Sequence, residues 1–106
     1  MDKALLTRGE KAGALLKARG DTVAVAESST GGLIAAALLA VPGASAYFIG
    51  GGVIYTAKAR AAFLQLDNAA MRGMRGASEP YALLSANTAR ERCGAVWGVG
   101  ETGATG

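Results

Sequence analysis

The sequence predicts an α/β fold: a three-layer α/β/α sandwich with a mainly parallel sheet, incomplete at its C-terminal end. The apolar stretch 22–26 is short enough for a buried strand and leads into a turn that contains Gly31 and Gly32. Strand-like and helix-like stretches then alternate along the chain, an order that gives parallel strands with helices on both faces. The length also fits, because 106 residues, 51% of them hydrophobic, suit a single domain over residues 1–106.

The N-terminal part of the sequence predicts two helices, one before this strand in the chain and one after it. Residues 2–19 carry their apolar side chains on one stripe, and Gly20 is a suitable C-terminal cap. Residues 33–41 are apolar on all sides, and Pro42 ends that helix. We expect the second helix to be covered by its own domain or by a second subunit.

The middle of the chain predicts strand at 47–49 and again at 53–55, on either side of the three glycines 50–52. Glycines inside a strand indicate a bulge or a close approach by a ligand or neighbour, and a bent connection is an equal alternative. Thr56 is a suitable N-cap for a short helix over residues 57–64.

The C-terminal part predicts an irregular segment, a helix and a third strand. Residues 67–76 show no regular pattern, whereas Ser78 can cap a helix that ends at Gly94. Residues 95–99 predict the strand, and the glycine-rich and hydroxyl-rich turn 100–106 follows it. Because no helix follows to cover this strand, we expect either more polypeptide or a partner chain there.

Composition argues against several functional classes. The basic residues behind the net charge of +3 are scattered, so the sequence favours no nucleic-acid partner. No apolar run of about 20 residues predicts a membrane span, and no secretory leader is recognisable. With no histidine and a lone Cys93, no metal site is expected. The single cysteine suits a reducing intracellular compartment, the cytoplasm first and an organelle as the alternative.

In a parallel sheet, ligands gather beyond the carboxyl ends of the strands, which brings the turns 27–32 and 100–103 to one crevice. Free backbone N–H groups at a helix start would attract an anion or a developing oxyanion. The hydroxyls of Ser28, Ser29 and Thr30 are candidate nucleophiles or phosphate ligands. The alternative for Ser28 and Thr30 is simple capping of the helix that follows.

Several motifs occur together in a specific order. They are Ala26-Glu27-Ser28-Ser29-Thr30-Gly31-Gly32, Val41-Pro42-Gly43-Ala44-Ser45-Ala46-Tyr47-Phe48, Tyr55 before a helix, Gly76-Ala77-Ser78-Glu79, and Trp97-Gly98-Val99-Gly100-Glu101-Thr102-Gly103-Ala104. Together they resemble the C-terminal domain family of the competence/damage-inducible protein CinA, in its stand-alone CinA-like form. The resemblance spans nearly the whole chain and implies that family members continue past the equivalent of Gly106.

The resemblance implies an α/β/α sandwich with nicotinamide mononucleotide deamidase activity. In that reaction a serine nucleophile hydrolyses the carboxamide to a carboxylate and ammonia, without a cofactor. Ser28 matches the family's serine. The resemblance and the turns described above together place substrate-binding residues at Glu27, Thr30, Gly31, Gly32, Tyr55, Thr102 and Gly103.

The chain departs from the family at one catalytic position. The family places a lysine five residues after its tyrosine, whereas this chain has Arg60 there and Lys58 two residues earlier. A lysine with a lowered pKa can accept the serine proton, but arginine stays protonated. Arg60 is therefore expected to bind phosphate or an oxyanion. Lys58 would point about 200° around the helix from Arg60 and could replace the amine only if the helix shifts.

These observations leave three hypotheses for function. The first is an amidohydrolase acting on nicotinamide mononucleotide or a related pyridine nucleotide, with Ser28, Arg60 and Lys58 as catalytic candidates. The second is a catalytically impaired domain of the same fold that serves as a structural or accessory subunit. The third is a ligand-sensing domain. The expected partners are a small-molecule nucleotide and either further copies of the chain or a larger assembly.

Overall fold

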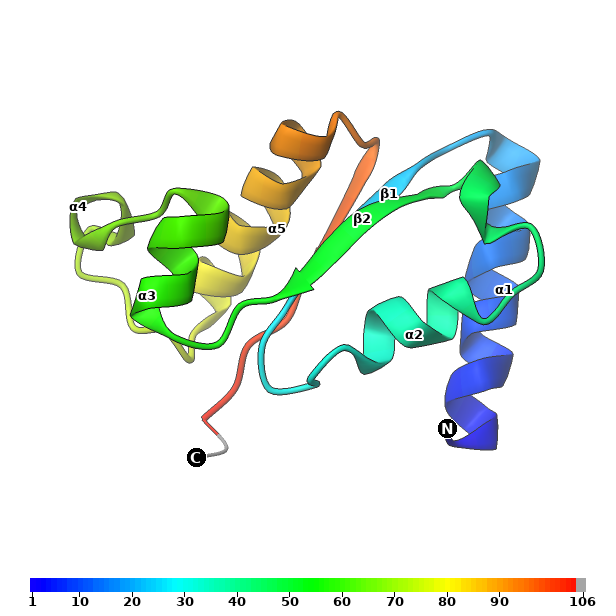
Figure 1. Ribbon diagram of the computed structural model, residues 1–106, viewed down its shortest axis with the longest axis horizontal. Coiled ribbons are helices and arrows are strands. Elements are labelled where there is room, and N and C mark those ends of the chain that lie inside the picture. The colour runs from blue at the N-terminus through cyan, green and yellow to red at the C-terminus, as the bar shows by residue number, and fades with distance from the viewer. Residues whose placement is uncertain (105–106) are drawn as a thin grey trace.

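The sheet has three parallel strands in the order β2-β1-β3, in a computed structural model that describes residues 1–104 (Figure 1). β1 spans Val23–Glu27, β2 spans Phe48–Val53 and β3 spans Trp97–Gly100. Both neighbours of the central strand β1 run parallel to it, so all three strands end at the same edge of the sheet. The prediction of an α/β fold with a mainly parallel sheet is confirmed.

Helices flank both faces of this sheet. On one face lie α1 (Lys3–Arg19) and α2 (Leu33–Leu39). On the other lies α5 (Glu79–Cys93), as Figure 1 shows. Shorter elements complete the chain: the 3₁₀ turn η1 (Ala44–Ala46), α3 (Ala57–Ala59), the π-helical turn η2 (Arg60–Leu64) and α4 (Asn68–Met71).

Alternate residues of β1 point into two separate cores. Val23 and Val25 pack with Leu38 and Tyr47 beneath α1 and α2. Ala24 and Ala26 pack against α5 in a core made of alanines. This alternation is the period of two expected for a strand buried on both faces.

Glycine lets α5 lie directly on β3. A Cβ atom added to Gly98 would lie 2.2 Å from the carbonyl oxygen of Ala86, and one added to Gly100 would lie 2.1 Å from that of Ala82. No side chain fits between the strand and the helix at these two positions. The close packing fixes where the chain leaves β3 and enters the loop that follows.

The structure changes two boundaries in the middle of the chain. The two predicted strand segments are one strand, because Gly50, Gly51 and Gly52 all pair with β1, with a register shift between Val23 and Ala24. Tyr47 lies outside this strand and is fully buried, and its hydroxyl donates a 2.5 Å hydrogen bond to the carbonyl oxygen of Leu38. Glycine carries no side-chain pattern, so the pairing of these residues left no signal in the sequence.

Three helical predictions also needed adjustment. α2 ends at Leu39 rather than at residue 41, and its Leu33 and Leu39 are each about half exposed. The helix expected over residues 57–64 changes from α to π geometry at Arg60. The segment 67–76, expected to be irregular, contains the single turn of α4. In the predicted turn 100–106, positions 105 and 106 lie outside the described residues.

Within residues 1–104, no helix is both long and apolar enough to cross a membrane.

Candidate active site

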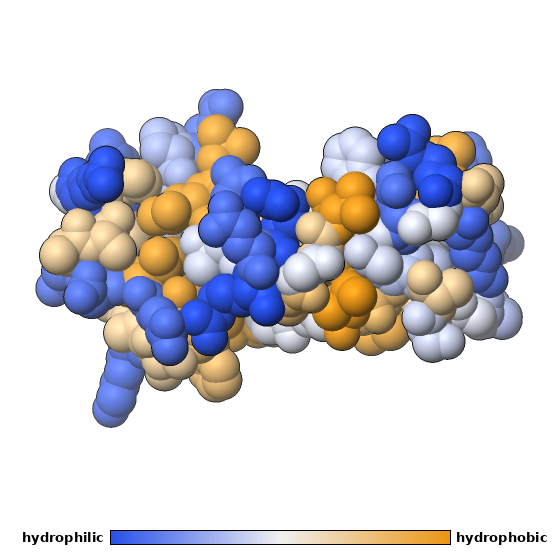
Figure 2. All heavy atoms as spheres, turned by 90° about the horizontal axis from the view of Figure 1, so that it is seen from above, coloured by the Kyte–Doolittle hydropathy of each residue, from blue (hydrophilic) through white to orange (hydrophobic). Residues whose placement is uncertain are grey.

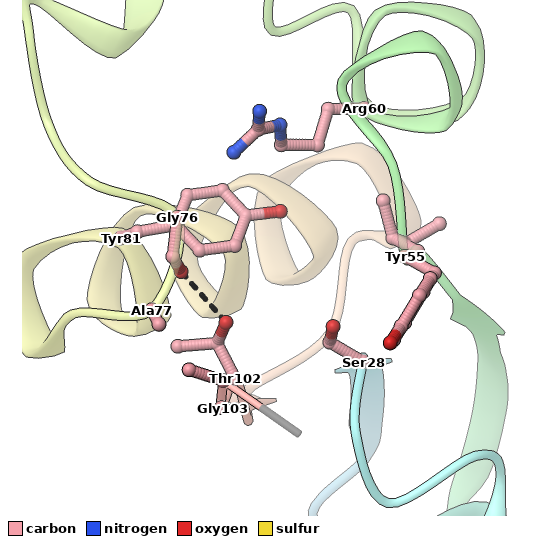
Figure 3. A pocket seen from close by; sticks show the side chains of 10 residues that line it. Ser28, Tyr55, Arg60, Gly76, Ala77, Tyr81, Thr102 and Gly103 are labelled. Carbon is pink, nitrogen blue, oxygen red and sulfur yellow. Dashed lines mark hydrogen bonds between the residues drawn. The ribbon is translucent and has the colours of Figure 1, made fainter. Parts of the chain in front are cut away.

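A cavity of about 360 Å³ lies beyond the carboxyl ends of the strands. It is lined by residues that follow each of the three strands and by the segment that leads into α5 (Figure 3). Ten residues form its wall: Ser28, Ile54, Tyr55, Arg60, Gly76, Ala77, Tyr81, Thr102, Gly103 and Ala104. Five of these were predicted as site residues from the sequence: Ser28, Tyr55, Arg60, Thr102 and Gly103.

The other five predicted residues are not on the wall of this cavity. They are Glu27, Thr30, Gly31, Gly32 and Lys58. Lys58 is exposed. Gly31 and Gly32 have φ angles of 62° and 100°, so they supply the left-handed backbone that turns the chain from β1 into α2. Their role in this structure is to shape the turn that carries Ser28.

Glu27 is a buried carboxylate that caps α2. It is 1% exposed, and its oxygens accept hydrogen bonds of 2.9 Å from the backbone N–H groups of Ile34 and Ala35. The Thr30 hydroxyl lies at hydrogen-bond distance from the same carboxylate, 2.7 Å from Oε1. The N–H groups at the start of α2 were expected to attract an anionic ligand, but two of them are already bound to this carboxylate.

Glu101 holds the turn after β1 from the opposite side. Its Oε1 accepts hydrogen bonds from the backbone N–H of Ser28 at 2.8 Å and from the N–H and hydroxyl of Thr30 at 3.0 and 2.7 Å. Its Oε2 accepts one from the hydroxyl of Ser29. The backbone donors of Ser28 and Thr30 are therefore bound to a second internal carboxylate.

These bonds keep Glu101 ionised. Burial raises the pKa of Glu101, but the hydrogen bonds from Ser29, Ser28 and Thr30 outweigh burial and hold the pKa at about 2. The sequence reasoning did not single out Glu101. The available signal was an acidic residue directly after the third strand, at the edge where ligands gather.

Thr30 joins the two carboxylates. Its Oγ1 lies 2.7 Å from Oε1 of Glu27 and 2.7 Å from Oε1 of Glu101. Because a hydroxyl carries one proton, it donates to only one of them at a time. Thr30 thus ties the end of β1 to the end of β3 and has a structural role behind the cavity wall.

The side chain of Ser28 reaches the cavity from this fixed turn (Figure 3). Ser28 is only 8% exposed, and its backbone N–H is held by Glu101. Among residues 1–104, no side-chain base accepts a hydrogen bond from its hydroxyl. The turn therefore presents the Ser28 side chain to the cavity without a hydrogen-bonded base beside it among these residues.

Among residues 1–104, Arg60 is the one charged residue on the cavity wall, and it lies across the cavity from Ser28 (Figure 3). The central carbon of its guanidinium group is 5.1 Å from the centre of the Tyr81 ring, a cation–π distance. Tyr81 is buried, which raises its pKa, and the nearby guanidinium partly opposes that rise. This stacking holds a positive charge at the cavity, where it can bind a phosphate or carboxylate.

The loop after β3 completes the wall. The hydroxyl of Thr102 donates a 2.7 Å hydrogen bond to the carbonyl oxygen of Gly76, which joins this loop to the segment before α5. A Cβ atom added to Gly103 would lie 2.6 Å from Oγ of Ser29, so the loop approaches the serine turn closely. The two turns predicted to meet at one crevice do so in the structure.

The described residues offer no cluster of three or more histidine, cysteine, aspartate or glutamate side chains that could hold a metal ion. The chemistry available from residues 1–104 is a fixed serine, a cation and tyrosine hydroxyls around an open cavity.

Comparison with known proteins gives a consistent family match. A family model described as the CinA C-terminal domain matches residues 6–106. A CinA-like protein of Anaeromyxobacter sp. (strain K) is 45% identical over 93 residues, which is 88% of this chain and 23% of that protein. A CinA-like protein of Prochlorococcus marinus (strain MIT 9313) is 41% identical over 92 residues, which is 87% of this chain and 21% of that protein.

Solved structures agree with the fold. The competence/damage inducible protein CihA from Agrobacterium tumefaciens superposes with a TM-score of 0.80 at 30% identity, covering 90% of this chain and 58% of that one. A CinA superfamily protein from Klebsiella pneumoniae 700603 gives a TM-score of 0.78 at 27% identity, covering 86% and 57%. The chain thus spans about a quarter or less of the length of these CinA-like proteins and somewhat more than half of the solved chains.

Proposed function

The chain belongs to the CinA C-terminal domain family, and on that premise we propose that it is an amidohydrolase-like domain that deamidates nicotinamide mononucleotide or a related pyridine nucleotide. The observation that carries the proposal is that Ser28 and Arg60 line one cavity of about 360 Å³. A cavity of that volume is within the range of small-molecule sites. No cofactor is required.

The proposed reaction is acyl transfer to Ser28. Its hydroxyl oxygen attacks the carboxamide carbon, the C–N bond breaks, and the serine proton leaves with the amine as ammonia. Water then hydrolyses the acyl-enzyme to the carboxylate and restores the serine. We assign Tyr55, whose side chain lines the cavity, as the donor to the developing oxyanion, because Glu101 already binds the backbone N–H groups of Ser28 and Thr30.

The two basic candidates receive different roles. Arg60 binds the substrate phosphate, since a guanidinium group matches phosphate geometry and stays protonated. Lys58 would have to turn inward from its exposed position before it could accept a proton, so the proposal gives it no step in this conformation. The proton of Ser28 passes instead to a water molecule in the cavity or to the leaving amine.

Ammonia release on incubation of the full-length protein with nicotinamide mononucleotide tests the proposal. We expect release above a Ser28→Ala control, and no difference between the two would overturn it. Arg60→Lys restores the family's residue at that position, and we expect it to raise the rate because a buried amine can act as a base.

A second candidate function, an accessory subunit of a larger assembly, rests on a different observation. Glu27 is the only charged residue between positions 22 and 57, and it is buried. The surface formed by α2 and β2 therefore carries no charge and leaves four large apolar side chains about half exposed: Leu33, Leu39, Ile49 and Val53. Apolar side chains also gather in patches on the face seen in Figure 2. Exposed apolar patches of this kind mark interaction surfaces.

The mass of the full-length protein in solution tests this second candidate. An oligomer that dissociates when Ile49→Lys and Leu39→Lys place charges on this surface would support it. A monomer at all concentrations would exclude self-association through α2 and β2.

A further inference from the structure

We infer that Glu101 is a specificity-determining residue that makes the cavity prefer a neutral carboxamide over the corresponding carboxylate at Ser28, while Arg60 holds the anionic end of the same molecule. This inference rests on the proposed function and deepens it. It assigns an orientation to the substrate and a reason for the product to leave.

A negative charge lies next to the turn after β1, on a residue that does not itself line the cavity. Oε1 of Glu101 lies 2.8 Å from the backbone nitrogen of Ser28, so its charge is in direct contact with the residue that carries the proposed nucleophile. The carboxylate is partly buried and tied to three successive residues of the turn. A second anion at Ser28 would meet this fixed charge and would find the N–H groups of Ser28 and Thr30 already in use.

The positive end is built into the π-helical turn. Arg60 stands on the far side of the cavity from Ser28 and is held over the ring of Tyr81 (Figure 3). None of the other described residues on the wall carries a charge. A mononucleotide therefore fits in one direction, with its phosphate at Arg60 and its uncharged amide at Ser28.

Hydrolysis changes the charge at only one end of such a molecule. The carboxamide is neutral, whereas the product has a carboxylate at the same carbon and the same phosphate. The product therefore gains repulsion from Glu101 and keeps its attraction to Arg60. A like charge this near, in a partly buried site, weakens binding by at least about tenfold. We therefore expect the acid to bind more weakly than the amide.

Equilibrium binding separates this effect from catalysis. In the full-length protein carrying Ser28→Ala, nicotinamide mononucleotide and the matching acid, nicotinic acid mononucleotide, are titrated by calorimetry at low ionic strength. We expect the amide to bind about tenfold more tightly. Adding Glu101→Gln should reduce this ratio of affinities towards one, mainly by increasing the affinity for the acid. Glutamine keeps the size and one acceptor oxygen, and the Ser29 hydroxyl can rotate to accept from its amide.

Two control variants test the two ends independently. Glu91→Gln removes one negative charge from an exposed side chain of α5 and should leave the ratio unchanged. Arg60→Gln should weaken both nucleotides by a similar factor and also leave the ratio unchanged. If Arg60→Gln changes the ratio instead, the assigned orientation is wrong.

The outcomes distinguish this inference from the proposed function. Binding of both nucleotides with a ratio that Glu101→Gln does not alter overturns the inference and leaves the proposed function standing. Failure of both nucleotides to bind the folded parent overturns both. If Glu101→Gln does not fold, the ratio of the two affinities in the parent decides, and a ratio of one or less overturns the inference.

Discussion

The carboxylate of Glu101 accepts a 2.8 Å hydrogen bond from the backbone N–H of Ser28, 73 positions earlier in the chain. This bond joins the last described loop to the turn after the central strand. It is part of a hydrogen-bond network in which the Thr30 hydroxyl lies between the carboxylates of Glu27 and Glu101. The candidate nucleophile is thus held by a network rather than by its own helix alone.

Glu101→Ala should lower the free energy of unfolding by roughly 2 kcal/mol, because it leaves the N–H groups of Ser28 and Thr30 without their charged acceptor. Urea denaturation at neutral pH measures the change. Glu91→Ala, which removes an exposed carboxylate from α5, should change stability by less than about 0.5 kcal/mol. Equal effects of the two substitutions would show that the network contributes nothing.

Stability should depend on Glu101 in the acid range. The pKa of Glu101 is lowered from 4.5 to about 2, so the unfolded chain takes up this proton first as the pH falls. The contribution is fully present above pH 4.5 and is lost as the pH falls towards 2. It amounts to at most about 3 kcal/mol. The stability difference between the parent and Glu101→Gln, followed by denaturant unfolding from pH 7 to 3, should therefore shrink. A constant difference would contradict this assignment.

Gly100→Ala should destabilise the fold by about 2–3 kcal/mol, because the added methyl group would lie 2.1 Å from the carbonyl oxygen of Ala82 and force α5 away from β3. Gly50→Ala is the matched control in β2, where the nearest atom is Sγ of Cys93 at 4.0 Å. We expect the control to cost less than about 1 kcal/mol. Thermal unfolding of both variants compares them directly, and a similar loss in each would argue against the close contact.

Tyr55→Phe and Tyr47→Phe should separate activity from stability. Tyr47 is fully buried and its hydroxyl is bonded to the carbonyl oxygen of Leu38, so its loss should cost about 1 kcal/mol. Tyr55 is exposed at the cavity, so its loss should leave stability unchanged and lower kcat for deamidation by at least about tenfold. Unfolding and ammonia release are measured on both. An unchanged kcat in Tyr55→Phe would remove Tyr55 from the mechanism.

The strand, turn and helix over residues 23–39 were predictable because each leaves a local pattern. A fully buried β1 reads as an uninterrupted apolar run, and Gly31 and Gly32 mark the turn. The rule that parallel strands end at one edge then brought Ser28 and Thr102 together correctly.

The rest depends on contacts between distant residues. Glu101 lies in a short glycine-rich loop with no periodicity, and its partners are more than 70 positions away. Glu27 was expected to bind substrate, and its use as an internal cap of α2 depends on its burial, which composition does not reveal. The π turn that begins at Arg60 likewise has no sequence pattern of its own.

Ser28 and Glu101 lie far apart in the sequence, so they are synthesised at different times. During synthesis the ribosome releases the turn of Ser28 long before Glu101, so a nascent chain carries the serine without the carboxylate that fixes it. Proteolytic loss of the segment after β3 would return the molecule to that state. In that state the backbone N–H groups of Ser28 and Thr30 would lack the acceptor that Glu101 supplies in the folded chain.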